Sequence, residues 1–122
     1  MEINVSQEQV RVPVTIVRIQ GDIDSQTSDM LLQQAKSQID EGAHNLLLDF
    51  SNVTYMSSYG IRALSQIYNW LREPGEIPMS THPSPHLKLL HVNPAVLKVL
   101  ELTGMNLYLD IFDDEAKALK AF

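Results

Sequence analysis

Residues 46–64 read LLLDFSNVTYMSSYGIRAL, and this stretch decides the fold. The unbroken apolar run from Leu46 to Leu48, directly before Asp49, is typical of a short strand that is covered on both faces. Residues 57–71 then have the apolar spacing of an amphipathic helix. The apolar stripe of this helix consists of Ile61, Leu64, Tyr68 and Leu71. A buried strand that leads through a short turn into such a helix indicates an α/β domain.

The flanking segments continue this alternation of strands and helices. We expect further strands at residues 10–19, 87–92 and 107–112. We expect further helices from Thr27 or Ser28 to Gly42, from Asn93 to Gly104, and from Asp113 onwards. The Pro-rich residues 72–86 are expected to form a loop. This order predicts an α/β layered domain, with a mixed β-sheet of four to five strands and about four α-helices.

Three local signals refine the ends of these elements. Because Pro13 cannot donate to a strand ladder, the start of the first expected strand should lie at a sheet edge or a bulge. Thr27 or Ser28 is expected to cap the first helix. Asn93 is expected to cap the third helix, with Pro94 in its first turn.

The composition predicts one compact domain over residues 1–122. Hydrophobic residues make up 44% of the chain and charged residues 20%, which is an ordinary globular balance. A domain of this length buries roughly two-thirds of the surface that its unfolded chain exposes. The chain has no cysteine, which excludes disulfides, thiol catalysis and cysteine-based zinc sites. The absence of cysteine is compatible with a cytoplasmic location, which is the one we expect.

The charge pattern argues against nucleic acid and against acidic membranes as partners. The formal net charge is -6, and no run of Lys or Arg forms the cationic cluster that phosphates require. No apolar run approaches the roughly 20 residues that span a bilayer, and the first residues lack the pattern of a secretory leader. We therefore expect a protein partner and no membrane span.

No metal, cofactor or catalytic group is expected. Asp22 and Asp24 offer two carboxylates without a third ligand. His82 and His86 are four residues apart, but the prolines at 83 and 85 prevent a helix from presenting both on one face. His91 is expected within a strand, where its role would be structural. Neither a Ser-His-Asp arrangement nor a Gly-rich phosphate loop can be argued, so we expect a binding protein rather than an enzyme.

The hydroxyl pair Ser57 and Ser58 at the start of the second helix has two interpretations. The commoner role of serine at this position is capping, which contributes about 1 kcal/mol. The alternative is a phosphorylation switch, since a phosphate adds about 1.5 to 2 negative charges and the amides of a helix start tolerate that charge. Such a site could alter binding at the surface without unfolding the domain.

The same segment carries a family signature. The hydrophobic strand that ends in Asp49 is followed by a short turn with Val53, and then by Met56 and Gly60 around a serine pair. Residues 21–24, Gly-Asp-Ile-Asp, are similar to the Gly-x-Leu-Asp turn of one family. Together these residues resemble the STAS domain of the anti-sigma factor antagonists. The order of elements agrees from about Val10 to the end of the chain, so the resemblance implies a STAS-like layered fold.

The resemblance also implies a function. A family member binds an anti-sigma factor that is a serine kinase, so that a sigma factor is released. Phosphorylation of one serine switches this binding off, and a serine phosphatase resets it. Ser58 lies at the position of the phosphorylated serine, and Ser57 is the alternative acceptor. Ser57 replaces the family's acidic residue, and Tyr59 replaces its small residue. Partner contacts are expected at Asp24, Met56, Ser57, Tyr59 and Gly60.

Two rival functions remain at this stage. The same fold could serve as a scaffold that is never phosphorylated, in a stress-signalling assembly or as a regulatory subunit of a lipid transporter. An enzyme or a small-ligand carrier would need an internal pocket lined by paired polar groups, and no sequence feature indicates one.

Overall fold

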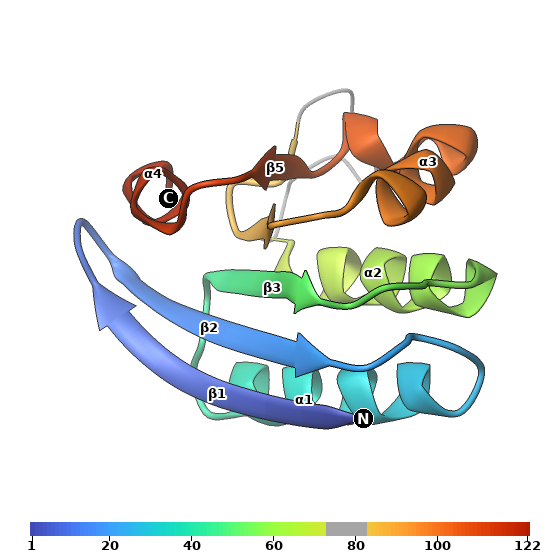
Figure 1. The fold of residues 1–122 in the computed structure, drawn as a ribbon. Coiled ribbons are helices and arrows are strands. Elements are labelled where there is room, and N and C mark those ends of the chain that lie inside the picture. Colours follow the sequence, from blue (N-terminus) through green and yellow to red (C-terminus); the bar gives the residue numbers. More distant parts are fainter. Residues whose placement is uncertain (73–82) are drawn as a thin grey trace.

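A computed structural model describes residues 1–72 and 83–122 (Figure 1). The strands are β1 Glu2–Gln9, β2 Pro13–Gln20, β3 Leu46–Asn52, β4 Leu87–Leu90 and β5 Asp110–Phe112. The helices are α1 Thr27–Asp40, α2 Ser58–Leu71, α3 Pro94–Thr103 and α4 Glu115–Lys120, with a 3-10 turn at Met105–Leu107. The predicted α/β class, with its mixed sheet and four helices, is confirmed for the described residues. Residues 73–82 of the expected loop lie outside the described residues.

The five strands lie side by side in the order β1-β2-β3-β4-β5. Figure 1 follows them from β1 at the lower edge to β5 near the top. The pair β1 and β2 is antiparallel, and the three following pairs are parallel. Because the helices α1, α2 and α3 connect the parallel strands, the loops that enter these helices all start at the same end of the sheet.

The first strand was not expected from the sequence. Strand β1 is largely polar, and seven of its eight residues are exposed. It is held by its ladder with β2, which runs from the pair Glu2 and Gln20 to the pair Gln9 and Pro13. Strand β2 is therefore not an edge strand, so the edge expected for Pro13 is wrong. Pro13 is tolerated because it is the first residue of β2, and the chain before it forms the turn from β1.

The sheet carries apolar packing on both faces. Helices α1, α2 and α3 contribute Leu31, Leu64 and Leu100 to the larger cluster, which contains Leu46 and Leu48 of β3. The smaller cluster on the other face contains Leu47 and the α4 residues Ala118 and Leu119, together with Val14, Ile16 and Leu90. Strand β3 is thus covered on both faces, as its unbroken apolar run predicts.

Two expected strand ends are wrong by a few residues. Strand β4 ends at Leu90, so His91 lies beyond it in a left-handed conformation with φ of 57°. The amide of His91 donates to the carbonyl of Phe112 at 2.8 Å, so that the pairing of β4 with β5 continues by one residue. Leu107 belongs to the 3-10 turn, and β5 begins only at Asp110. None of the helices in the described parts of the chain is long and apolar enough to cross a membrane.

An ion-pair network ties α4 to the centre of the sheet. Arg18 Nη1 of β2 lies 2.8 Å from Asp49 Oδ2 of β3 and 2.8 Å from Glu115 Oε1 of α4. The hydroxyl of Ser51 also donates to Asp49, and the amide of Ser51 donates to it at 2.9 Å. Burial alone would raise the pKa of Asp49, but the hydrogen bonds from Ser51 and the Arg18 guanidinium outweigh it and lower that pKa. Asp49 is therefore ionised in the folded protein.

This network predicts a pH-dependent contribution to stability. Because the folded state lowers the pKa of Asp49, the stabilisation is complete above the unfolded value of about 3.9 and disappears as the pH falls through the folded value. Asp49→Asn should lower the free energy of unfolding at pH 7 by about 1–3 kcal/mol. Urea unfolding of both proteins between pH 7 and pH 3 measures the difference, which should shrink below about pH 4.

Asp113→Asn is the matched control, because it makes the same Asp-to-Asn change at an exposed residue outside the network. It should leave the free energy of unfolding within about 0.5 kcal/mol of the unaltered chain at every pH. Equal destabilisation by both substitutions would contradict the role given to Asp49.

Candidate functional site

The loops that follow β2 and β3 are joined by a short parallel bridge between Ile23 and Met56. The amide of Ile23 donates to the carbonyl of Tyr55 at 3.0 Å, and the amide of Ser57 donates to the carbonyl of Ile23 at 2.9 Å. Both bridged side chains are buried. The residues that directly follow the bridge, Asp24 and Ser57, are consequently held at the same end of the sheet, and Ser58 comes next in the chain.

Two polar side chains fix the loop before α2. The hydroxyl of Thr54 donates to Asp22 Oδ1 at 2.6 Å, which links the two bridged loops a second time. The amide Nδ2 of Asn93 donates to the carbonyl of Val53 at 2.9 Å. Asn93 Oδ1 accepts from the amide of Val96 at 2.8 Å, so the expected cap of α3 is confirmed. The sequence did not indicate that this cap also holds the neighbouring loop.

Asp24 organises the start of α1. Its Oδ1 accepts from the amides of Gln26 at 2.9 Å and Thr27 at 3.0 Å, while the Thr27 hydroxyl accepts from the amide of Asp24 at 2.8 Å. The expected cap by Thr27 or Ser28 is wrong, because Thr27 is already inside the helix and Ser28 is buried. Hydrogen bonds from Thr27 and Gln26 lower the pKa of Asp24, so this exposed carboxylate carries its charge.

The two serines at the start of α2 have different environments. Ser57 is the cap, with extended backbone, and its Oγ accepts from the amide of Tyr59 at 3.2 Å. Ser58 is the first residue of the helix and is exposed. Its hydroxyl takes part in no hydrogen bond within residues 1–72 and 83–122. The two interpretations of the pair therefore separate: Ser57 caps, and Ser58 presents a free hydroxyl to solvent.

Gly60 allows α2 to lie close to the bridge. A Cβ atom built on Gly60 would overlap Met56 Cγ, and it would lie 2.6 Å from Met56 Sδ and 3.1 Å from Ile23 Cγ2. No larger residue fits without a shift of Met56, whose side chain is 1% exposed. Met56 and Gly60, both expected as partner contacts, thus lie beneath the surface. Their side chains support the start of α2 from inside.

We call the exposed residues that flank the bridge and begin α2 the Ser58 surface, which consists of Asp24, Tyr55, Ser58 and Tyr59. Tyr55 is 54% exposed and Tyr59 is 47% exposed, so both aromatic rings are accessible at the surface. Tyr55 was not identified from the sequence. No sequence signal distinguishes Tyr55, because its outward orientation is known only from its exposure in the structure.

A shallow pocket of about 310 Å³ adjoins this surface between α1 and α2. Tyr59 and Arg62 line it from α2, and Asp29 and Leu32 line it from α1. Both Asp29 and Arg62 are exposed. Neither residue was singled out in the sequence, because the two helices that bring them together are separated by a strand.

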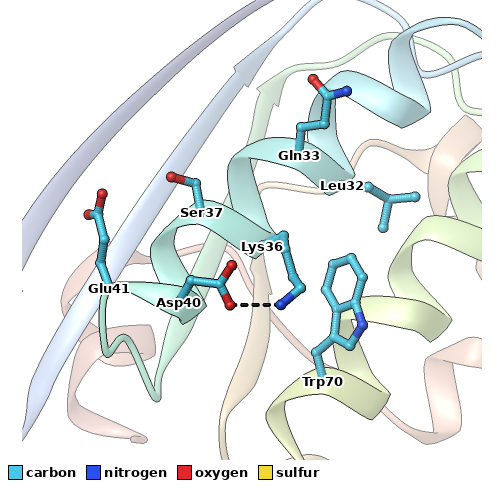
Figure 2. Close-up of a pocket in the computed structure, with 7 residues that line it drawn as sticks. All are labelled: Leu32, Gln33, Lys36, Ser37, Asp40, Glu41 and Trp70. Atoms are coloured by element: carbon cyan, nitrogen blue, oxygen red, sulfur yellow. Dashed lines mark hydrogen bonds and ion pairs between the residues drawn. The ribbon is translucent and has the colours of Figure 1, made fainter.

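A larger pocket of about 550 Å³ lies elsewhere along the same helix pair (Figure 2). Lys36 Nζ lies 2.7 Å from Asp40 Oδ1 and 5.9 Å from the centre of the Trp70 ring. Figure 2 shows this lysine between the carboxylate and the indole, so that its charge is already satisfied. The remaining lining residues are Leu32, Gln33, Ser37 and Glu41.

The histidines are placed as follows. His86 Nδ1 lies 3.0 Å from Asn45 Oδ1, which ties the chain before β4 to the chain before β3. His82 lies outside the described residues. Within the described ranges, no three His, Asp or Glu side chains gather in a way that could hold a metal ion.

The chain was compared with known proteins. The STAS domain profile matches residues 5–79. The anti-sigma F factor antagonist of Paenibacillus polymyxa is 28% identical over 107 residues, which cover 87% of this chain and 84% of that protein.

Solved structures share the fold. An anti-sigma factor antagonist from Mycobacterium paratuberculosis superposes with a TM-score of 0.76 at 22% identity, covering 98% of this chain and 93% of that one. Unphosphorylated SpoIIAA gives a TM-score of 0.72 at 19% identity, covering 96% and 94%. Phosphorylated SpoIIAA from Bacillus gives 0.65 at 18% identity, covering 96% and 97%. The predicted STAS-like fold is confirmed.

Because Gly60 lies so close to Met56, we expect substitutions of these two residues to have non-additive effects on the free energy of unfolding. Gly60→Ala should lower the free energy of unfolding by about 1–3 kcal/mol, because the new methyl group clashes with Met56. The same change in an ordinary helix position would stabilise by about 0.5–1 kcal/mol. In a Met56→Ala background the overlap with Met56 is removed and only the 3.1 Å approach to Ile23 Cγ2 remains, so Gly60→Ala should cost much less there.

Urea unfolding of the unaltered chain, both single variants and the double variant completes this cycle. Equal costs of Gly60→Ala in the two backgrounds would contradict the packing described above.

Proposed function

Because the chain belongs to the STAS domain family, we propose that it is an anti-sigma factor antagonist. It binds an anti-sigma factor that is also a serine kinase, and this binding releases a sigma factor. Phosphorylation of Ser58 weakens the complex, and a serine phosphatase restores it. The name of the Paenibacillus polymyxa relative supports this activity. The observation that carries the proposal is the exposed, unbonded hydroxyl of Ser58 on a STAS fold.

The geometry favours Ser58 over Ser57 as the acceptor. The Ser58 hydroxyl can attack the γ-phosphate of ATP in the kinase without first breaking a hydrogen bond within the described chain. ADP leaves, and the hydroxyl proton passes to a base of the kinase. Ser57 Oγ, by contrast, already accepts a hydrogen bond from the amide of Tyr59 in its role as the cap.

The phosphate changes the charge of the Ser58 surface. It adds about 1.5 to 2 negative charges at the start of α2, where the amide of Ser57 donates to the carbonyl of Ile23, the residue before Asp24. A partner surface that accommodates the neutral hydroxyl then meets a concentrated negative charge. The amides at the start of α2 favour a nearby anion, so the fold tolerates the modification. The shared fold of the two SpoIIAA forms supports this tolerance.

The partner contacts follow from exposure. Asp24, Ser57 and Tyr59 offer side-chain atoms to a partner, whereas Met56 and Gly60 set the position of α2 from below. Under this proposal residues 1–122 act as one STAS domain in the cytoplasm, where sigma factors and ATP are found. The chain contributes binding and no catalytic group.

The phosphorylation site can be mapped directly. The chain should be incubated with ATP and the serine-kinase anti-sigma factor of its own organism, and the product analysed by mass spectrometry. We expect one phosphate on Ser58, its loss in Ser58→Ala, and its retention in Ser57→Ala. Binding of the kinase should weaken at least about tenfold in the phosphorylated form, which corresponds to about 1.4 kcal/mol.

A phosphate at any residue other than Ser57 or Ser58 would overturn the mechanism. Tight binding of the kinase without any phosphorylation would favour the scaffold instead, and Ser58→Ala would then leave its function complete.

Tyr59 provides a second test that does not depend on phosphorylation. Exposed tyrosines at the centre of an interface often contribute about 2 kcal/mol to binding. Tyr59→Ala should therefore weaken binding of the anti-sigma factor by about tenfold to thirtyfold in calorimetric titration. Leu102→Ala is the matched control, because Leu102 is an apolar side chain on α3 that is 77% exposed.

Both variants should unfold at the same urea concentration as the unaltered chain, since neither side chain belongs to the core. Equal affinities of the Tyr59 and Leu102 variants would place the contact surface away from Tyr59.

A further inference from the structure

Arg62 lies one helical turn after Ser58 on α2, a spacing that sets two residues on the same helix face. Side chains four residues apart have Cβ atoms about 5–6 Å from each other. Because the Cα–Cβ bonds of a helix tilt toward its start, a long side chain at position 62 leans over the turn that contains Ser58. Both residues are exposed, so no packing contact holds them apart.

The guanidinium of Arg62 is not engaged by another charge. It takes part in none of the ion pairs among residues 1–72 and 83–122. Asp29 of α1 lines the same pocket but is not within ion-pair distance of it. Arg62 is therefore a cation without an ion-pair partner in the described parts of the chain, on the helix face that carries Ser58. It can bind the negative charge that Ser58 gains on phosphorylation.

We propose that Arg62 is the internal counter-charge for phosphorylated Ser58, an inference that rests on the proposed function. Guanidinium groups bind phosphate oxygens through two parallel hydrogen bonds and remain charged at any physiological pH. Arg62 is a positioning residue here: it draws the phosphate along α2 toward the pocket between α1 and α2. Phosphorylation then changes two features of the surface, because it adds a phosphate and also removes Arg62 as a free cation for the partner.

Charged groups on α2, on the β2–α1 loop and on α1 affect the second ionisation of the phosphate. Arg62 stabilises the dianion and lowers the second pKa of the phosphate, which is about 6 in phosphoserine. The carboxylates of Asp22, Asp24 and Asp29, from the β2–α1 loop and α1, act in the opposite direction.

The test places phosphoserine at position 58 by genetic encoding, so that no kinase is needed. The second pKa of the phosphate is then measured by ³¹P NMR in the otherwise unaltered chain and in Arg62→Gln. We expect Arg62→Gln to raise this pKa by about half a unit, and Arg62→Lys to raise it less. Arg11→Gln is the matched control, since Arg11 is an exposed arginine in the turn between β1 and β2.

The outcomes are distinct. An equal phosphate pKa in the unaltered and Arg62→Gln chains overturns the inference. An equal rise in Arg11→Gln also overturns it, because net charge alone would then explain the effect. Urea unfolding of unphosphorylated Arg62→Gln checks that the fold is intact. Failure of a kinase to modify Ser58 would overturn the proposed function without affecting this measurement, whereas an unchanged pKa would overturn only the role of Arg62.

Discussion

The contact between Gly60, Met56 and Ile23 is the constraint on which the candidate site depends. Met56 bridges Ile23 in parallel, and Gly60 brings the first turn of α2 against both side chains. Because the bridge fixes the loops that follow β2 and β3, the start of α2 has one position relative to the sheet. The buried contact between Gly60, Met56 and Ile23 therefore holds Ser58 at the surface. A residue without a Cβ is what makes this close approach possible.

Local sequence signals predicted the parts of the fold that local interactions determine. The apolar run of β3, the apolar stripe of α2 and the cap at Asn93 each depend on residues that are close together in the sequence. Strand β1 could not be found in this way, because its polar residues are held by a ladder with β2 rather than by a pattern of their own. The bond between Arg18 and Glu115 spans 97 positions of sequence, so no local signal indicates how α4 is attached.

The sequence likewise indicated some residues of the candidate site and missed others. The motif in the sequence predicted that Ser58 lies at the start of the second helix, and Ser58 is the first residue of α2. The distinction between Ser57 as cap and Ser58 as free hydroxyl required the hydrogen bond from the amide of Tyr59. Tyr55 and Arg62 become visible only when exposure and pocket lining are known, because their residue types are common and their spacing is unremarkable in the sequence.

The structure separates the residues that maintain the site from those that can change its partner. Ile23, Met56 and Gly60 are buried against one another, so a substitution at any of them alters packing at the start of α2. Of the two residues that depart from the family pattern, Tyr59 is exposed and Ser57 is half-buried, and neither side chain belongs to the contact between Ile23, Met56 and Gly60. Substitutions at these two positions therefore change the surface that a partner would meet rather than the contact between Ile23, Met56 and Gly60, because that contact is made by buried atoms.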